Sequence, residues 1–287
     1  MPLMSRLHPC PLCRKNNFRV LFSNSRQIVK CREDGLVMVN PLPTSKEIAS
    51  LYGPAYFKNF DPYLKNRSAH LNYFRKKLVQ IEKRKKSRGR ILDVGCAVGF
   101  FLGEVEAGGW SGLGIDLSDY ALSFCRKKGL KVRKGDLKGV GLSSSSFDVV
   151  VSLQTIEHEV DPLFHLREIH RVLKPGGLMV LTTPDHDSWT RKLMGSRWFG
   201  YRHEEHLLFL NRDVLRLMLK RSGFKRVKIE RDDPRIFTLN YYLTRLADFY
   251  PNVVVKGMTS MVKRIVGQLP VPALTDPWGD MIIFAYK

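Results

Sequence analysis

From residue 90 to the end of the chain, short apolar runs alternate with longer segments that are apolar on one side only. The short runs predict strands, and the longer segments predict helices. The predicted strands are 90–95, 112–117, 131–134, 147–154, 177–183, 225–230 and 281–286. The predicted helices are 99–107, 119–128, 161–173 and 211–222. Because strands and helices alternate, we expect an α/β fold with a mostly parallel, doubly wound sheet covered on both faces.

The chain divides into three predicted parts. Residues 1–43 mix short apolar alternations with Cys, Pro and Asn and predict a small ribbon of two hairpins, and residues 44–89 predict a helical linker. Residues 90–287 form the α/β domain, with insertions at 186–205 and 234–279. Segments longer than a connection needs are often lids or substrate-binding pieces.

The second insertion contains a helical pattern with apolar residues on one face and Lys and Arg beside them. One interpretation is a cap helix that packs on the domain. The other is a surface that touches a membrane or a lipid-linked substrate.

Composition narrows the class of protein. A chain of 287 residues suits one large domain with an appendage, and its net charge of +21 favours nucleic acid, anionic headgroups or acidic metabolites as partners. No run of about 18 apolar residues and no secretory signal is found. We therefore expect a cytoplasmic protein.

Five cysteines, two of them as Cys10-Pro-Leu-Cys13, favour a metal site in a reducing compartment over a disulfide framework. Cys31 is the third cysteine of the ribbon, whereas Cys96 and Cys125 are expected to be buried packing residues.

The run RILDVGCAVGFFL, residues 90–102, predicts a strand, a turn through Gly95, Cys96, Ala97 and Gly99, and then a helix. Such a turn gathers backbone N–H groups and a partial positive charge, which a phosphate or a carboxylate could use. The spacing lacks the Gly-x-Gly-x-x-Gly of dinucleotide-binding turns, so a nicotinamide cofactor is disfavoured.

Acids follow three successive strands. Asp93 suits a ligand with a cationic amino group, and Asp116, followed by Leu117, can accept hydrogen bonds from both ribose hydroxyls. Asp136 can bind an adenine amino group while the backbone N–H of Leu137 meets the ring. These three carboxylates together point to S-adenosylmethionine.

Five motifs in the expected order, ILDVGCAVGFFL, GLGIDLS, KGDL, FDVVVSLQTIEHEVDP and RVLKPGGLMVLTTP, make the chain resemble the class I S-adenosylmethionine-dependent methyltransferases. The resemblance implies a seven-stranded Rossmann-like sheet whose last strand is antiparallel. It also implies cofactor contacts that extend to Gln154. Ala97 departs from the family, which usually has glycine there.

The segment CPLC…CREDG, followed by the methyltransferase core, is similar to a group of bacterial and archaeal methyltransferases that modify polysaccharides, lipids or secondary metabolites. Their ribbon normally has four cysteines. Here Asp34 takes the fourth position, so the resemblance implies a zinc site of Cys10, Cys13, Cys31 and Asp34, with His8 as a substitute for Asp34.

Two histidines are candidate general bases for a hydroxyl acceptor, His158 after the fourth strand and His206 after the first insertion. For each, the alternative is a structural hydrogen bond. Quinone-type O-methyltransferases carry an acid three residues before the Glu-His pair and can bind a divalent metal there, whereas this chain has Gln154, so we expect metal-independent transfer.

The favoured function is O-methylation of a small molecule or of a glycan or lipid biosynthetic intermediate. One alternative is an RNA methyltransferase, since zinc fingers also accompany this core in enzymes that modify ribosomal RNA. The other is a non-catalytic, cofactor-binding partner subunit. The sequence does not name the acceptor, and it lacks the Asn/Asp-Pro-Pro-aromatic signature of many enzymes that methylate amino groups of bases.

Overall fold

The computed structural model describes residues 8–23, 26–44, 67–201, 204–233 and 279–287, with isolated positions at 47, 64, 237–238, 243, 257, 260–262 and 270–271. Of the helical linker expected at 44–89, residues 67–82 form a described helix, whereas most of the part before residue 67 lies outside the described residues. The amphipathic helix expected in 234–279 also lies outside the continuously described stretches.

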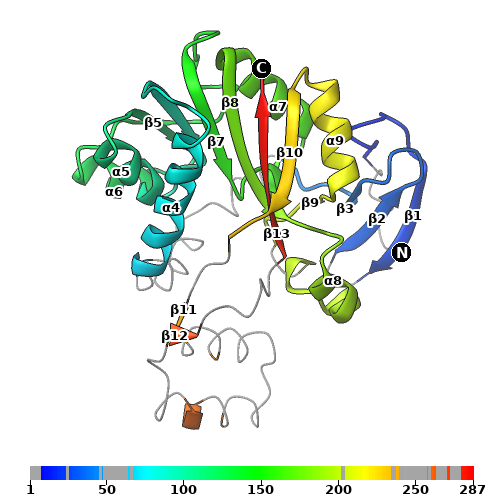
Figure 1. Cartoon of the computed structure of the whole chain (residues 1–287). Coiled ribbons are helices and arrows are strands. Elements are labelled where there is room, and N and C mark those ends of the chain that lie inside the picture. The colour runs from blue at the N-terminus through cyan, green and yellow to red at the C-terminus, as the bar shows by residue number, and fades with distance from the viewer. Residues whose placement is uncertain are drawn as a thin grey trace.

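A seven-stranded sheet forms the centre of the molecule, in the order β10-β13-β8-β7-β4-β5-β6 (Figure 1). Its strands are β4 (Arg90–Val94), β5 (Ser111–Asp116), β6 (Val132–Lys134), β7 (Phe147–Leu153), β8 (Leu173–Pro184), β10 (Lys225–Arg231) and β13 (Asp280–Tyr286). Only β13 runs antiparallel to its neighbours in this sheet. The predicted fold class and all seven predicted strands are confirmed.

The chain runs outward from β4 through β5 to β6, and then in the other direction from β7 to β8. The switch in strand order therefore lies between β4 and β7. In open α/β sheets, ligands bind at the carboxyl ends of the strands beside this switch.

Helices cover both faces of the sheet. The helices α4 (Arg67–Glu82), α5 (Phe100–Ala107) and α6 (Asp119–Lys127) meet one face, and α7 (Pro162–Val172) and α9 (Arg212–Arg221) meet the other. Alternate strand residues supply the two cores, as a pleated strand requires, with Val149 on the first face and Val150 on the second. The side chains of Asp161 and Asn211 cap α7 and α9, as their sequence positions predict.

The N-terminal ribbon is part of a second sheet, of β1 (Phe18–Ser23), β2 (Gln27–Cys31), β3 (Val37–Val39) and β9 (Leu208–Phe209). The two expected hairpins form as β1–β2 and β2–β3, which share β2. In addition, β3 pairs with β9, which comes from beyond residue 205.

The ribbon packs against the α/β domain on both of its faces. Leu12 and Met38 belong to the core shared with α7 and α9, whereas Ile28 and Val37 pack with Trp198. The ribbon thus lies beside the first insertion and α9 (Figure 1).

The first insertion forms α8 (Trp189–Met194) and two short 3-10 helices, Gly195–Arg197 and Phe199–Tyr201. Short strands β11 (Phe237–Thr238) and β12 (Pro270–Val271) pair within the second insertion. Both ends of that insertion meet the carboxyl edge of the sheet, because the amide of Asp232 donates to the carbonyl of Asp280, which pairs with Pro184.

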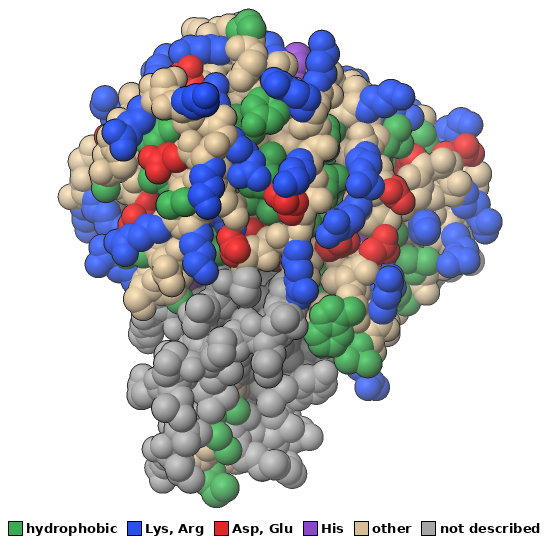
Figure 2. Space-filling view, in the orientation of Figure 1, with side chains coloured by type: hydrophobic (Ala, Val, Ile, Leu, Met, Phe, Trp, Pro, Cys, Tyr) green, Lys and Arg blue, Asp and Glu red, His purple; other side chains and the backbone are tan. Residues whose placement is uncertain are grey.

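Hydrophobic surface gathers over α8 in Figure 2, where Trp189 and Leu193 are 53% and 77% exposed. Among the helices that the structure describes, none combines the length and apolar character that crossing a bilayer requires.

Candidate functional site

The turn after β4 is tightly packed and needs glycine at two positions. Gly95 and Gly99 have φ angles of +75° and +74°, in the left-handed region that favours glycine. A Cβ atom on Gly95 would lie 2.8 Å from the Thr155 hydroxyl, and one on Gly99 would lie 2.7 Å from the Cys125 sulfur. The turn leads into α5, so its backbone carries the positive end of a helix dipole.

Asp116 ties this turn to the next strand. Its Oδ2 accepts the amide of Ala97 at 2.9 Å, and its Oδ1 accepts the amide of Ser118 at 2.9 Å. Burial raises the pKa of Asp116, although the backbone amides oppose that shift. Each carboxylate oxygen has a second lone pair, so the group can also accept two ribose hydroxyls.

Asp93 is 3% exposed beneath the turn. Burial, followed by the negative charges of Cys125 and Asp116, raises the pKa of Asp93 to about 8. A cation close to this carboxyl would lower its pKa and favour the charged carboxylate. The amino group of a bound S-adenosylmethionine would supply one.

Other predicted cofactor contacts are distributed along the same edge. Leu117 is 48% exposed and offers an apolar surface, whereas the side chains of Leu137 and Cys96 are buried in the core, so only their backbone can meet a ligand. Asp136 Oδ1 already accepts two amides of its own turn, at 3.0 and 2.7 Å. Gln154 has a φ of +54°, and its amide nitrogen lies 3.4 Å from the hydroxyl of Thr182.

The structure brings the two candidate bases together. The ring centroids of His158 and His206 are 5.2 Å apart. Glu157 joins them, and ligand atoms of the three residues lie within 4.8 Å of one another. Two histidines and a carboxylate at this separation can hold a divalent metal ion as well as act on a proton.

Hydrogen bonds fix the short helix η1 (Ile156–His158), which presents Glu157 and His158. The hydroxyl of Thr155 donates to the carbonyl of Val94, at the start of the glycine turn, at 3.2 Å. The hydroxyl of Thr183 donates to the Glu157 carboxylate at 3.0 Å. The histidines therefore occupy one edge with the predicted cofactor turn.

A buried network supports the same helix from behind. His165 on α7 lies 3.0 Å from Glu159 and 3.1 Å from the hydroxyl of Ser152 on β7. Ser152 is fully buried in the sheet, so this Ser-His-Glu arrangement supports the turn and offers no nucleophile to a substrate.

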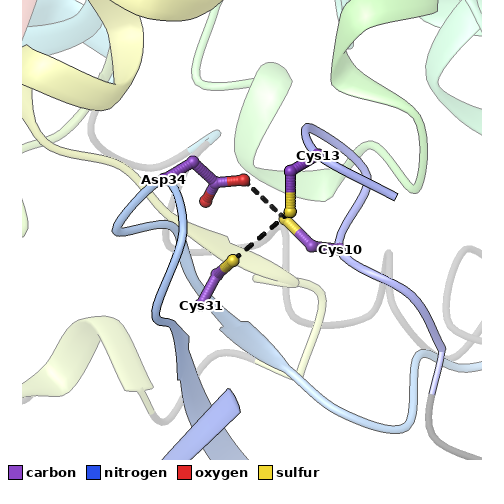
Figure 3. A group of neighbouring side chains, drawn as sticks. All are labelled: Cys10, Cys13, Cys31 and Asp34. Carbon is purple, nitrogen blue, oxygen red and sulfur yellow. Dashed lines mark hydrogen bonds between the residues drawn. The ribbon is translucent and has the colours of Figure 1, made fainter. Parts of the chain in front are cut away.

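Four predicted metal ligands converge in the ribbon (Figure 3). Cys10 Sγ lies 3.0 Å from Asp34 Oδ2, Cys13 Sγ lies 3.5 Å from Cys31 Sγ, and the four ligand atoms fall within 4.8 Å of one another. Thiolates about 2.3 Å from a tetrahedral zinc are about 3.8 Å apart. Three cysteines and one carboxylate at these separations fit zinc. His8, the expected substitute for Asp34, instead accepts the amide of Leu42 with its ring at 3.2 Å.

The fold, the glycine turn and the acidic strand ends define a Rossmann-like methyltransferase. A family model described as a methyltransferase domain matches residues 63–229, more than half of the chain, and the chain belongs to that family.

Among curated relatives, the chain is 29% identical over 150 residues to a ubiquinone biosynthesis O-methyltransferase of Ruegeria pomeroyi, covering 48% of this chain and 60% of the relative. It is 29% identical over 153 residues to 2-methyl-6-phytyl-1,4-hydroquinone methyltransferase 2 of Oryza sativa, covering 51% and 42%. The match thus spans about half the length of these relatives.

A phosphoethanolamine N-methyltransferase 2 of Haemonchus contortus, solved with S-adenosylmethionine, superposes with a TM-score of 0.57 at 18% identity, over 93% of this chain and 70% of that chain. This likeness shows the fold.

Sequence reasoning missed Glu157 as a member of the site and Thr155 as the link to the glycine turn. For Glu157 the signal was its place beside His158. For Thr155 the local sequence carries no signal, because its role depends on β4 and β7 being adjacent.

Proposed function

We propose that this chain binds S-adenosylmethionine at the carboxyl edge of its sheet and methylates an oxygen atom of a small molecule. The observation that carries the proposal is the convergence of His158 and His206 beside a glycine turn that Asp116 braces. The relatives named for ubiquinone biosynthesis and for a hydroquinone point to a hydroxylated ring as the acceptor.

When bound, S-adenosylmethionine supplies an electrophilic methyl carbon on a sulfonium, so that the oxygen–carbon bond forms as the carbon–sulfur bond breaks. The chain then has to hold the acceptor in line, exclude water and take its proton. In this scheme Asp116 holds the ribose, Asp93 meets the amino group, and the exposed side chain of Leu117 lies along the adenine.

His206 is prepared to accept the proton. Its Nδ1 lies 3.2 Å from the carbonyl oxygen of Gly200. A carbonyl only accepts, so Nδ1 carries hydrogen and Nε2 keeps a lone pair. His158, at 5.2 Å between ring centroids, can relay that proton or orient the acceptor.

The test of this proposal is transfer of labelled methyl groups to a panel of catechols and hydroquinones. His206→Asn keeps a donor near the Gly200 carbonyl but removes Nε2, and we expect a fall in kcat of about 10²-fold or more with unchanged affinity for S-adenosylhomocysteine. Full activity in both His206→Asn and His158→Gln would refute the assignment. An absence of S-adenosylhomocysteine binding would refute the enzyme assignment, whereas binding without any methyl transfer would favour the non-catalytic, cofactor-binding partner subunit.

A metal-assisted version of the same reaction draws on the Glu157–His158–His206 group. A metal there would bind the acceptor oxygen and lower its pKa, and the histidines would then be ligands and not bases. Loss of turnover on chelation that Mg²⁺ alone restores would support this scheme, because Mg²⁺ does not replace zinc at the ribbon thiolates.

An RNA acceptor is favoured by one observation. Arg90, Arg126, Lys131 and Arg133 line a cavity of about 510 Å³ at the amino ends of β4, β5 and β6. That is the edge opposite the glycine turn, so it would hold a phosphate backbone away from the methyl group. RNA affinity that falls steeply with salt would support this candidate. The same labelled-methyl assay also tests glycan and lipid-linked acceptors.

We also propose that Cys10, Cys13, Cys31 and Asp34 hold structural zinc. Purified protein should contain one zinc per chain, Asp34→Cys should retain it and Cys13→Ser should lose it. Metal-free protein with an unchanged thermal midpoint would contradict this.

A further inference from the structure

Arg26 reaches from the ribbon to the segment that carries His206. It lies directly before β2, and its Nη1 donates to the carbonyls of Glu204 at 2.7 Å and His206 at 3.0 Å. Its Nη2 donates to the carbonyl of Tyr201 at 3.1 Å. The donors of a guanidinium lie in one rigid plane, so one side chain fixes the relative positions of three carbonyls.

The residue after His206 is held by the backbone on two sides. The amide of Leu207 donates to the carbonyl of Glu157 at 2.8 Å, and the amide of Val39 on β3 donates to the carbonyl of Leu207 at 2.9 Å. The ribbon therefore contacts the His206 segment twice, through Arg26 and through β3. The same segment contacts the helix that presents His158.

Arg26 keeps its charge across the working range of pH. Burial lowers the pKa of Arg26, while the nearby carboxylates of Glu204 and Glu205 raise it. The reference value is so high that the guanidinium stays protonated. Its hydrogen bonds to the three carbonyls are therefore independent of pH.

We propose that Arg26 is a positioning residue for methyl transfer, which holds His206 opposite His158 from the N-terminal ribbon. The ribbon then forms one wall of the acceptor side of the site and is not a separate module. This inference rests on the proposed role of His206 as a base.

The variants Arg26→Lys and Arg26→Gln test it, with Arg221→Gln as a matched control. Arg221 Nη1 donates to the ribbon carbonyl of Leu12 at 2.8 Å, so the control also removes one arginine-to-carbonyl bond between ribbon and core. It leaves the His206 segment untouched. Lysine keeps the charge of Arg26, but a single nitrogen cannot hold three carbonyls.

Three measurements are made: hydrogen exchange of the Leu207 amide, the ¹⁵N signals of the His206 ring, and titration with S-adenosylhomocysteine. In the Arg26 variants we expect Leu207 to exchange at least about tenfold faster and the His206 ring to become a mixture of tautomers. The cofactor affinity should stay within about twofold of the parent, as in Arg221→Gln. An active acceptor should show a lower kcat with an unchanged KM for S-adenosylmethionine.

Unchanged Leu207 exchange and unchanged His206 signals in a folded Arg26→Lys protein would overturn the inference. Should both variants fail to fold, the parent protein still tests the inference. An Arg26 held by three carbonyls rotates slowly and gives separate NMR signals for its Nη atoms. Signals of a freely rotating guanidinium would refute the inference. A parent that binds no S-adenosylhomocysteine refutes the proposed function. The Leu207 exchange results test the Arg26 contact independently of that outcome.

Discussion

Asp116→Asn is the sharpest test of the cofactor site, because it changes one charged atom and little of the shape. In the parent, Oδ1 and Oδ2 each accept a backbone amide at 2.9 Å, from Ser118 and Ala97. Asparagine has one accepting oxygen. Its NH₂ group must therefore face one of these amides, donor against donor.

The size of the effect follows from these contacts. A hydrogen bond to a charged group contributes about 1.5–3 kcal/mol, so losing one lowers the free energy of unfolding by that order. Burial raises the pKa of Asp116, so removing the charge recovers part of the loss. We expect a net destabilisation of about 1–2 kcal/mol.

Ligand binding should suffer more than stability. Both ribose hydroxyls would lose a charged acceptor, and about 1.5–3 kcal/mol corresponds to roughly tenfold to hundredfold weaker binding. Calorimetric titration of S-adenosylhomocysteine into parent and variant measures this, with thermal unfolding as the control for folding. An affinity within about threefold of the parent in a folded variant would refute the placement of the ribose at Asp116.

The remaining predictions concern the pH dependence and the interior. Because the pKa of Asp93 is raised to about 8 in the folded protein and lies near 3.9 when unfolded, its stabilising effect is complete below pH 4 and is lost as the pH rises toward 8. Asp93→Asn should flatten that decline in thermal midpoint, and an identical pH profile would contradict the assignment. Ala97 has a φ of +46°, so Ala97→Gly should raise the free energy of unfolding by about 1 kcal/mol in urea titrations, and a destabilised variant would show that the turn is unstrained. Lys77 and Asp232 form an ion pair with side chains 0% and 1% exposed, so Lys77→Met should lower the free energy of unfolding by about 3–5 kcal/mol. The control Lys76→Met, at an exposed position, should lower it by less than about 0.5 kcal/mol, and equal thermal midpoints for the two variants would rule out a buried charge pair.

The sheet could be predicted from the sequence because each strand has a local hydrophobic pattern. The run before Gly95 is apolar and β-branched, and the helix that follows repeats its apolar residues at helical spacing. The glycines of the turn and the acids at the strand ends lie within a few residues of those signals. The proposed cofactor side of the site could thus be predicted from the order of elements alone.

The proposed acceptor side could not be predicted in the same way. β9 has two residues, and its partner β3 lies about 170 positions earlier in the chain, with Met38 opposite Leu208. No local pattern specifies a two-residue strand, because its pairing depends on tertiary contacts. The approach of His206 to His158 depends on this pairing, so the sequence offers both histidines but not their separation.

The ribbon contacts explain how a short, irregular insertion can hold His206, the proposed base, in place. Loops that carry chemistry need support from rigid elements, since a displacement of about 1 Å at a reacting group can cost about 10²-fold in rate. Here β2 links the Cys31 cluster at its carboxyl end to Arg26 before its amino end, a span of about 17 Å at the usual rise of a strand. Zinc bound at Cys31 would order β2 and with it the Arg26 guanidinium that donates to the His206 segment. The proposed zinc site and the proposed methyl-transfer site would then lie at the two ends of one strand.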